Sequence, residues 1–276
     1  MRENEVVNPS IRKNFSEELN RGSTEGTAPL PPIKAGRSVG WIIAATSFAF
    51  AVIQLDVTIV NVALPRISAD LGASLAELQW VVDAYTLGFA ALLISAGVVS
   101  DRWGAKHAFL AGFVGFAAAS LACGLAPGPG FLNAARFIQG IGAASLVPSS
   151  LAILNTASAH DRRLRARAIG IWTAAGGAAI AAGPVVGGLL LSGMGWRSIF
   201  LVNLPVCALG LGLTLWCVPP TVADKTPSRS LDLPGQALAI VALAALIGIA
   251  RLIDRSLRLD RPSSISDPAV TTVPPL

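Results

Sequence analysis

Seven apolar segments, each about twenty residues long, divide most of this 276-residue chain. They cover residues 40–64, 79–99, 107–126, 131–154, 167–191, 198–218 and 233–252. About twenty residues of α-helix cross the roughly 30 Å hydrocarbon layer of a bilayer. Backbone groups in lipid must be hydrogen-bonded within the protein, and segments of this length are too long for barrel strands. The sequence therefore predicts an all-α, polytopic membrane protein.

The composition excludes a soluble domain. Hydrophobic residues make up 53% of the chain and charged residues only 13%, with a mean hydropathy of +0.62, whereas soluble domains carry roughly 25% charged residues. The net charge of +5 could indicate a nucleic-acid partner. The basic residues lie beside the apolar segments, however, and none of the known nucleic-acid-binding motifs is present. We expect a lipid bilayer around the chain and no nucleic acid.

The placement of Lys and Arg predicts the orientation. The N-terminal tail and every second gap between segments hold fourteen of these residues, and the alternate gaps hold two. Because positive residues concentrate on the cytoplasmic side, we expect a cytoplasmic N-terminus in the inner or plasma membrane of the cell. Residues 1–37 are polar and lack the apolar core of a signal peptide, which predicts a disordered cytoplasmic tail.

The end of the chain departs from this pattern. Residues 219–232 are expected to form a cytoplasmic loop and 233–252 a seventh transmembrane helix. The irregular tail 253–276 then carries several arginines on the side that should be poor in them. Two interpretations stay open, namely external charge that an already fixed topology tolerates, or a truncated or frameshifted reading frame.

An internal repeat relates the second and fifth segments. GVVSDRWGAKHAF at 97–109 aligns with GLLLSGMGWRSIF at 188–200, an offset of 91 residues. The matching positions are Gly97 with Gly188, Gly104 with Gly195, Lys106 with Arg197, and Phe109 with Phe200. Three segments per unit place the two copies on opposite faces, which is typical of the inverted repeats of secondary transporters. Chance similarity between glycine-rich turns is the alternative.

Five motifs, in order and spacing, resemble the Major Facilitator Superfamily, and specifically its drug:proton antiporters with fourteen spans. They are LDVTIVNVALP (55–65), GVVSDRWGAKHAF (97–109), RFIQGIGAA (136–144), GPVVGG (183–188) and WRSIFLVNLP (196–205). The resemblance covers about residues 40–250. It implies the N-terminal six-helix bundle of such a transporter at 38–218, built as a 3+3 inverted repeat, with the seventh helix added.

The resemblance assigns a gating role to the loop after the second segment. Its candidate residues are Gly97, Asp101, Arg102, Gly104 and Lys106. The glycines permit a tight turn and close helix contact, and the charges can hold two helix ends together. The family usually has a basic residue where this chain has Ala105, so one contact of this latch is absent. A charged turn with a purely topological role is the alternative.

Two ionisable residues lie within membrane depth, where charge is costly and therefore usually functional. From the expected segment ends, Asp56 lies about 12 Å and Arg136 about 8 Å from the outer face. They can therefore pair across a helix interface. The resemblance implies that Arg136 takes part in proton coupling, and we expect Asp56 to take up and release the proton. A structural ion pair between two helices is the alternative.

Further candidates lie nearby. Asp83 is either interfacial or a contact for entering substrate, and Gln139 either packs between helices or donates to substrate. By resemblance, the fifth segment carries the antiporter motif at a bending helix. Its residues are Gly183, Pro184, Gly187 and Gly188. A role in helix packing alone is the alternative.

The sequence lacks a phosphate-binding loop and any paired catalytic or metal-ligand constellation, so we expect neither an enzyme nor a metal or other cofactor. The proton gradient is the expected energy source. The predicted function is proton-coupled efflux of small amphipathic or cationic compounds by antiport. The alternative is a non-transporting membrane fragment, or interaction partner, derived from such a transporter. The substrate and the oligomeric state do not follow from the sequence.

Overall fold

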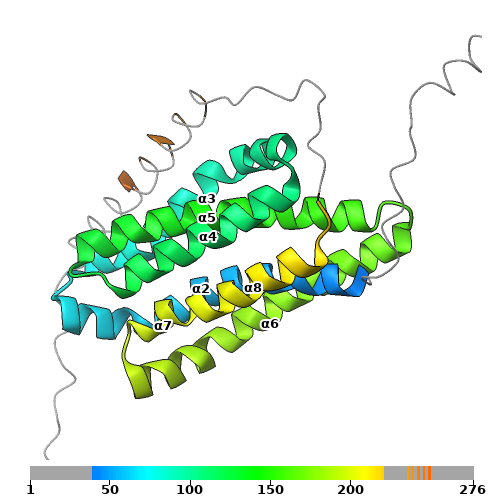
Figure 1. Cartoon of the computed structure of the whole chain (residues 1–276). Coiled ribbons are helices and arrows are strands. Elements are labelled where there is room, and N and C mark those ends of the chain that lie inside the picture. Colours follow the sequence, from blue (N-terminus) through cyan, green and yellow to red (C-terminus); the bar gives the residue numbers. More distant parts are fainter. Residues whose placement is uncertain are drawn as a thin grey trace, which may run out of the picture. The chain divides into compact units, whose positions relative to one another are not determined.

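A computed structural model describes residues 39–220 and seven single positions between 235 and 249. The continuous part folds into helices joined by short turns (Figure 1). The helices are α2 (Val39–Leu71), α3 (Leu75–Trp103), α4 (Ala105–Gly124), α5 (Pro129–Ala157), α6 (Arg162–Met194), α7 (Ser198–Leu201) and α8 (Asn203–Cys217). The expected tails 1–37 and 253–276, and nearly all of the expected loop 219–232, lie outside the described residues. In the expected seventh helix, only those seven single positions are described, and each is helical.

Within residues 39–220, five helical stretches are long and apolar enough to cross a membrane, namely α2, α4, α5, α6 and the combined segment Ser198–Cys217. The helix α3 makes a sixth if its two parts, Leu75–Leu93 and Ser95–Trp103, which meet at 53°, form one span. This confirms the all-α, multi-pass membrane fold. Several helices extend beyond the apolar segments, since α2 continues to Leu71 and α6 begins at Arg162.

Local sequence explains where the helices begin. Ser74 and Glu77 form a capping box at the start of α3, and the Asp161 side chain accepts from two backbone N–H groups at the start of α6. Such caps satisfy N–H groups that a helix cannot bond internally. Gly104 and Gly195, the pair matched by the internal repeat, both have positive φ, at 85° and 77°. Both α3 and α6 therefore end at a glycine whose positive φ other residues rarely adopt, which agrees with a structural repeat.

The sixth span is interrupted. The helix α7 ends at Leu201 and α8 begins at Asn203. Pro205 lacks the N–H group that would bond the Leu201 carbonyl in a continuous helix, so the backbone ladder is broken at this point. The interruption brings Phe200 and Asn203 to the middle of the bundle, beside α2 and α4.

The helices pack across the two halves of the repeat. The first half consists of α2, α3 and α4, and the second of α5, α6 and α7–α8. The helix α5 packs most extensively on α3 and α4, and α2 packs mainly on α6, with further contacts to α5 and α8 (Figure 1). The first helix of each half, α2 or α5, therefore packs mainly against helices of the other half, and α2 and α5 also contact each other.

Apolar side chains surround this contact between α2 and α5. Val52 and Ile53 of α2 belong to one buried cluster with the phenylalanines of α4, and Ile59 and Val60 to a second cluster with Leu132 of α5. Asp56 lies between these two stretches of α2. The fold therefore places one carboxylate between two apolar clusters.

Candidate functional site

Asp56 on α2 and Arg136 on α5 form an ion pair in the interior of the bundle. Arg136 Nη1 lies 2.6 Å from Asp56 Oδ2, and the two side chains are 1% and 0% exposed. A charge buried in this way is stable only when it is paired and hydrogen-bonded. The structure thus brings together the two residues whose depth in the sequence suggested a pair.

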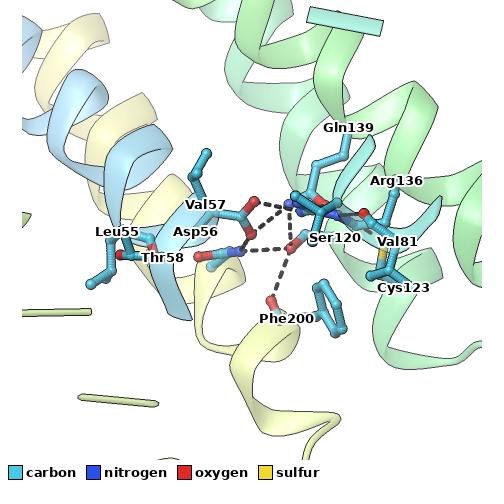
Figure 2. Close-up of polar contacts among 12 residues, drawn as sticks. Leu55, Asp56, Val57, Thr58, Val81, Ser120, Cys123, Arg136, Gln139 and Phe200 are labelled. Atoms are coloured by element: carbon cyan, nitrogen blue, oxygen red, sulfur yellow. Dashed lines mark hydrogen bonds and ion pairs between the residues drawn. The ribbon is translucent and has the colours of Figure 1, made fainter. Parts of the chain in front are cut away.

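Two amides and a hydroxyl complete the cluster, which also involves α4 and α8 (Figure 2). Asp56 Oδ1 accepts from Gln139 Nε2 at 2.9 Å and from Asn203 Nδ2 at 2.8 Å. The same two amide groups donate to Ser120 Oγ, at 3.2 and 2.9 Å. Ser120 Oγ in turn donates to the carbonyl of Phe200 at 3.0 Å. We call Asp56, Ser120, Arg136, Gln139 and Asn203 the buried polar cluster.

The guanidinium of Arg136 is fixed from several sides. Its Nε donates to the Val81 carbonyl at 3.1 Å, and its Nη1 donates also to Gln139 Oε1 at 2.9 Å. The guanidinium carbon lies 4.2 Å from the centre of the Tyr85 ring, a cation–π geometry. A planar, multiply bonded guanidinium of this kind is not replaceable by lysine without loss of contacts.

Glycines of α5 allow the helices that carry the cluster to approach one another. A Cβ atom on Gly140 would overlap the backbone carbonyl of Tyr85 on α3, and one on Gly142 would overlap the backbone of Phe116 on α4. Small residues at such positions are how helices pack closely in membranes. The GIGAA part of the RFIQGIGAA motif therefore holds α3 and α4 within reach of Arg136 and Gln139.

Every hydrogen bond that the described residues make to the Asp56 carboxylate comes from an N–H donor. No donor of this set can itself accept a proton from the carboxyl group. If Asp56 is protonated, at least one amide must move or rotate to provide an acceptor.

Asp83 is not part of this cluster. It lies half-buried on α3, and it makes no hydrogen bond with Asp56, Arg136 or Gln139 among the described contacts. Gln139, by contrast, bridges Asp56 and Arg136. Its amide links α5 to α2 and α4, which agrees with the expected role in helix packing, and a contact with substrate stays a prediction.

The residues of the expected gating loop lie at the junction of α3 and α4. Asp101 and Arg102 are exposed in the last turn of α3, Gly97 is half-buried one turn earlier, and Gly104 forms the turn. Lys106 Nζ donates to the Val218 carbonyl at 2.5 Å. Lys106 therefore caps the C-terminal end of α8, an arrangement that satisfies a carbonyl left free at a helix end.

The GPVVGG motif presents two different faces of α6. Gly183 and Gly187 are buried against α2, where a Cβ atom would overlap the Thr58 side chain and press on Ile59, respectively. Pro184 and Gly188 lie on the exposed face, and a Cβ atom on Gly188 would meet nothing within 4 Å. In the described structure, half of this motif thus packs α6 onto α2 and half faces outward.

Sequence reasoning did not single out Asn203 or Ser120. Asn203 belongs to the WRSIFLVNLP motif and is the only amide in that apolar segment, so its desolvation cost was an available signal. Ser120 lies among alanines and offers no such signal, because a serine in a membrane helix commonly bonds its own backbone.

A second ion pair lies at the end of the bundle where α2 meets α3. Arg197 Nη1 lies 2.7 Å from Asp70 Oδ2, and the two side chains are 43% and 51% exposed. Trp196 Nε1 donates to the same oxygen at 2.7 Å, and Arg197 Nη2 donates to the Ala126 carbonyl at 3.2 Å. This contact ties the start of α7 to the ends of α2 and α4.

The fold and the buried polar cluster together define a multi-pass membrane protein with one ion pair enclosed in a helical bundle. The family model of the Major Facilitator Superfamily matches residues 46–259. The chain belongs to this superfamily.

Curated relatives are drug resistance proteins. The methylenomycin A resistance protein of Streptomyces coelicolor is 46% identical over 204 residues, which is 74% of this chain and 42% of that protein. The multidrug resistance protein Stp of Mycobacterium tuberculosis is 45% identical over 203 residues, 74% of this chain and 37% of its own length. A puromycin resistance protein of Streptomyces alboniger is 40% identical over 209 residues, 75% of this chain and 41% of its own length. The matched region thus spans about two fifths of these relatives.

Proposed function

We propose that this chain forms the proton-binding half of a secondary transporter that exports small amphipathic or cationic compounds in exchange for protons. Asp56 is the proton carrier. The positive charge of Arg136 influences when Asp56 binds and releases the proton. The observation that carries this proposal is the complete burial of the Asp56–Arg136 pair among apolar clusters. The names of the relatives support export of toxic small molecules as the activity.

The mechanism uses competition for one carboxylate. With the cluster open to one side of the membrane, a proton neutralises Asp56 and weakens its bond to Arg136. With the cluster open to the other side, a cationic or polar substrate group is favoured when Asp56 is ionised. Each ligand therefore lowers the affinity for the other by the same factor. About 1.4 kcal/mol per pH unit and about 2.3 kcal/mol per charge per 100 mV are available to drive the exchange.

Membrane and orientation belong to the same proposal. We place the protein in the cell membrane with the N-terminus in the cytoplasm, on the strength of the asymmetric distribution of Lys and Arg. In this orientation the Asp70–Arg197 pair lies at the outer face and Lys106 at the inner face.

A second proposal is that the chain does not translocate substrate by itself and acts as a membrane interaction partner. Secondary transporters bind their substrates between two related units. The described helices α2 to α8 build one such unit, and the relatives are more than twice as long as the matched region. The activity then depends on a second unit.

The test is transport in inverted membrane vesicles that contain either this chain or this chain joined to the C-terminal half of the methylenomycin A resistance protein. Puromycin and ethidium, both amphipathic and cationic, are the probes. We expect uptake that depends on an imposed pH gradient in the joined protein, and its loss on Asp56→Asn. Activity of the unjoined chain would contradict the second proposal.

Asp161→Asn is the matched control, because Asp161 lies outside the buried polar cluster and asparagine is an equally good helix N-cap. It should transport like the unchanged protein. Gradient-driven uptake that survives Asp56→Asn would show that another group carries the proton.

A further inference from the structure

The carboxamide of Asn203 differs from that of Gln139 in how firmly it is held. Gln139 Oε1 accepts from Arg136 Nη1 at 2.9 Å and from the thiol of Cys123 at 3.6 Å. Turning the Gln139 amide over would set its N–H groups against the guanidinium. For Asn203 Oδ1, the described part of the chain provides no donor, and only its Nδ2 is bonded. Asn203 can therefore turn over without losing a bond to its oxygen.

The two oxygens of Asp56 face different partners. Oδ2 faces the guanidinium of Arg136, while Oδ1 faces the amide groups of Gln139 and Asn203. A proton added to Oδ1 forms an O–H donor that points at two N–H donors, which is unfavourable. The conflict ends if one amide presents its oxygen, and Asn203, unlike Gln139, can do so without giving up a bond to that oxygen.

Four other titratable side chains face Asp56 in the described structure. Facing it are Arg136 on α5, Tyr85 on α3, Cys123 on α4 and Cys207 on α8. Arginine stays charged, and a buried tyrosine or thiol stays neutral. The helix α6 presents glycines to this part of α2. The cluster is thus arranged around one exchangeable proton.

We propose that Asn203 is a proton-operated switch, whose side-chain amide turns over when Asp56 is protonated and passes the signal through Ser120 to the break between α7 and α8. This inference rests on the proposed role of Asp56 as proton carrier.

At Asn203 the relay exchanges two hydrogen bonds that Nδ2 donates for two that Oδ1 accepts, and it gives up the bond from Ser120 to the Phe200 carbonyl. In the ionised state, Ser120 Oγ accepts from Gln139 and Asn203 and donates to the Phe200 carbonyl. After the turn, Asn203 Oδ1 accepts from the new Asp56 O–H and from the Ser120 hydroxyl. The hydroxyl then leaves the Phe200 carbonyl. Phe200 lies one residue before the end of α7, so the interrupted backbone loses a bond at its break.

The consequence is mechanical as well as chemical. The start of α7 is held by Trp196 and Arg197 on Asp70. Once the Phe200 carbonyl is released, α7 can pivot on this contact relative to α8. Switching at a discrete break of this kind converts one proton into a change of helix geometry.

The test is solid-state NMR of the full chain in lipid bilayers, with ¹³C-aspartate and ¹⁵N-asparagine. The Asp56 Cγ shift reports protonation, and its dipolar coupling to the Asn203 Nδ2 reports the amide orientation. We expect a coupling at neutral pH that is lost when the Cγ shift moves on acidification. Loss of the coupling in Asn203→Leu assigns it to Asn203. Asn61→Leu is the control, because the Asn61 amide bonds to the backbone of its own helix. This substitution should leave the coupling unchanged.

Two outcomes overturn the proposal and are distinguishable. If the Asp56 Cγ shift moves and the coupling persists, Asn203 does not turn and the switch is wrong, while the proton carrier stands. If the Cγ shift never moves while the chain stays folded, the proton carrier and the switch both fail. In Ser120→Ala the acid-induced shift of the Phe200 carbonyl carbon should disappear, and its persistence would contradict the relay.

Discussion

At the scale of single residues, burial separates the two ion pairs of the described structure. The Asp56–Arg136 pair is fully enclosed, whereas Asp70 and Arg197 are about half exposed. An exposed pair contributes little to stability, since water and salt screen it. A buried pair contributes little net stability, but removing one partner leaves an uncompensated charge in the interior. The two pairs should therefore respond differently to the same substitution.

We expect Arg136→Gln to destabilise the folded bundle by about 3–5 kcal/mol, because Asp56 is then buried without a countercharge. Adding Asp56→Asn should recover most of this loss, since two neutral amides can bond to each other. Thermal or denaturant unfolding in detergent, analysed as a double-mutant cycle, measures the coupling.

The exposed pair provides the comparison. Arg197→Gln should destabilise the bundle much less than Arg136→Gln, because water and salt screen the exposed pair. If Arg136→Gln costs no more than Arg197→Gln, or if the double substitution is as unstable as the single one, Asp56 is not held by charge pairing.

Asp56, Arg136 and Gln139 of the buried polar cluster were singled out from the sequence, whereas Ser120 and Asn203 were not. Asp56 and Arg136 are conspicuous because charge within a span is so unfavourable. Ser120 and Asn203 carry no charge, and only the fold shows that they meet Asp56 from α4 and α8. The charges of the expected gating loop were equally visible in the sequence, yet Lys106 binds a helix end, Val218, that no pattern would pair with it.

At the scale of the elements, glycine spacing explains how α6 is attached. This helix packs mainly on α2, and Gly176, Gly183 and Gly187 line the contact. The face that holds Gly188 is open in the described structure. Two glycines of one motif therefore have different structural roles, which a matched pair of substitutions can separate.

Gly183→Ala should destabilise the bundle by about 1–3 kcal/mol, because the new methyl group overlaps the Thr58 side chain and the two helices must separate. Gly188→Ala should be neutral or stabilising by up to about 1 kcal/mol, since alanine is the better helix former and meets nothing. Unfolding in the same detergent compares the two. Equal effects of both substitutions would contradict the observed packing of α6.

Helix ends were the least predictable feature at this scale. Hydrophobicity marks only the part of a helix that lies in lipid. The first apolar segment therefore ended at residue 64, whereas α2 reaches Leu71. The fifth apolar segment began at residue 167, whereas α6 begins at Arg162. Caps such as Ser74 and Asp161 set the true limits. Pro205 is a sequence signal for the helix break before Asn203. Hydropathy alone does not show this break, because the apolar segment continues across it.

In the described bundle as a whole, the helices obey the internal repeat, but the side chains of the buried polar cluster do not. Asp56 and Arg136 lie on the equivalent helices α2 and α5, and Ser120 and Asn203 on the equivalent helices α4 and α8. At the offset of 91 residues, however, Asp56 corresponds to Val147. Symmetry therefore supplies four helix positions around one point, and asymmetric side chains supply a single carboxylate there.

The inverted repeat also predicts which junctions face opposite sides of the membrane. Gly104 and Gly195 are equivalent turns separated by three spans, so the α3–α4 and α6–α7 junctions must lie at opposite faces. With the N-terminus in the cytoplasm, a membrane-impermeant maleimide added to intact cells should label Ser192→Cys and leave Asp101→Cys unlabelled until the cells are opened. The unsubstituted chain serves as the blank, because its cysteines Cys123, Cys207 and Cys217 are buried. Labelling of both positions from the same side would contradict the inverted repeat, and labelling of Asp101→Cys alone would reverse the orientation while leaving the repeat intact.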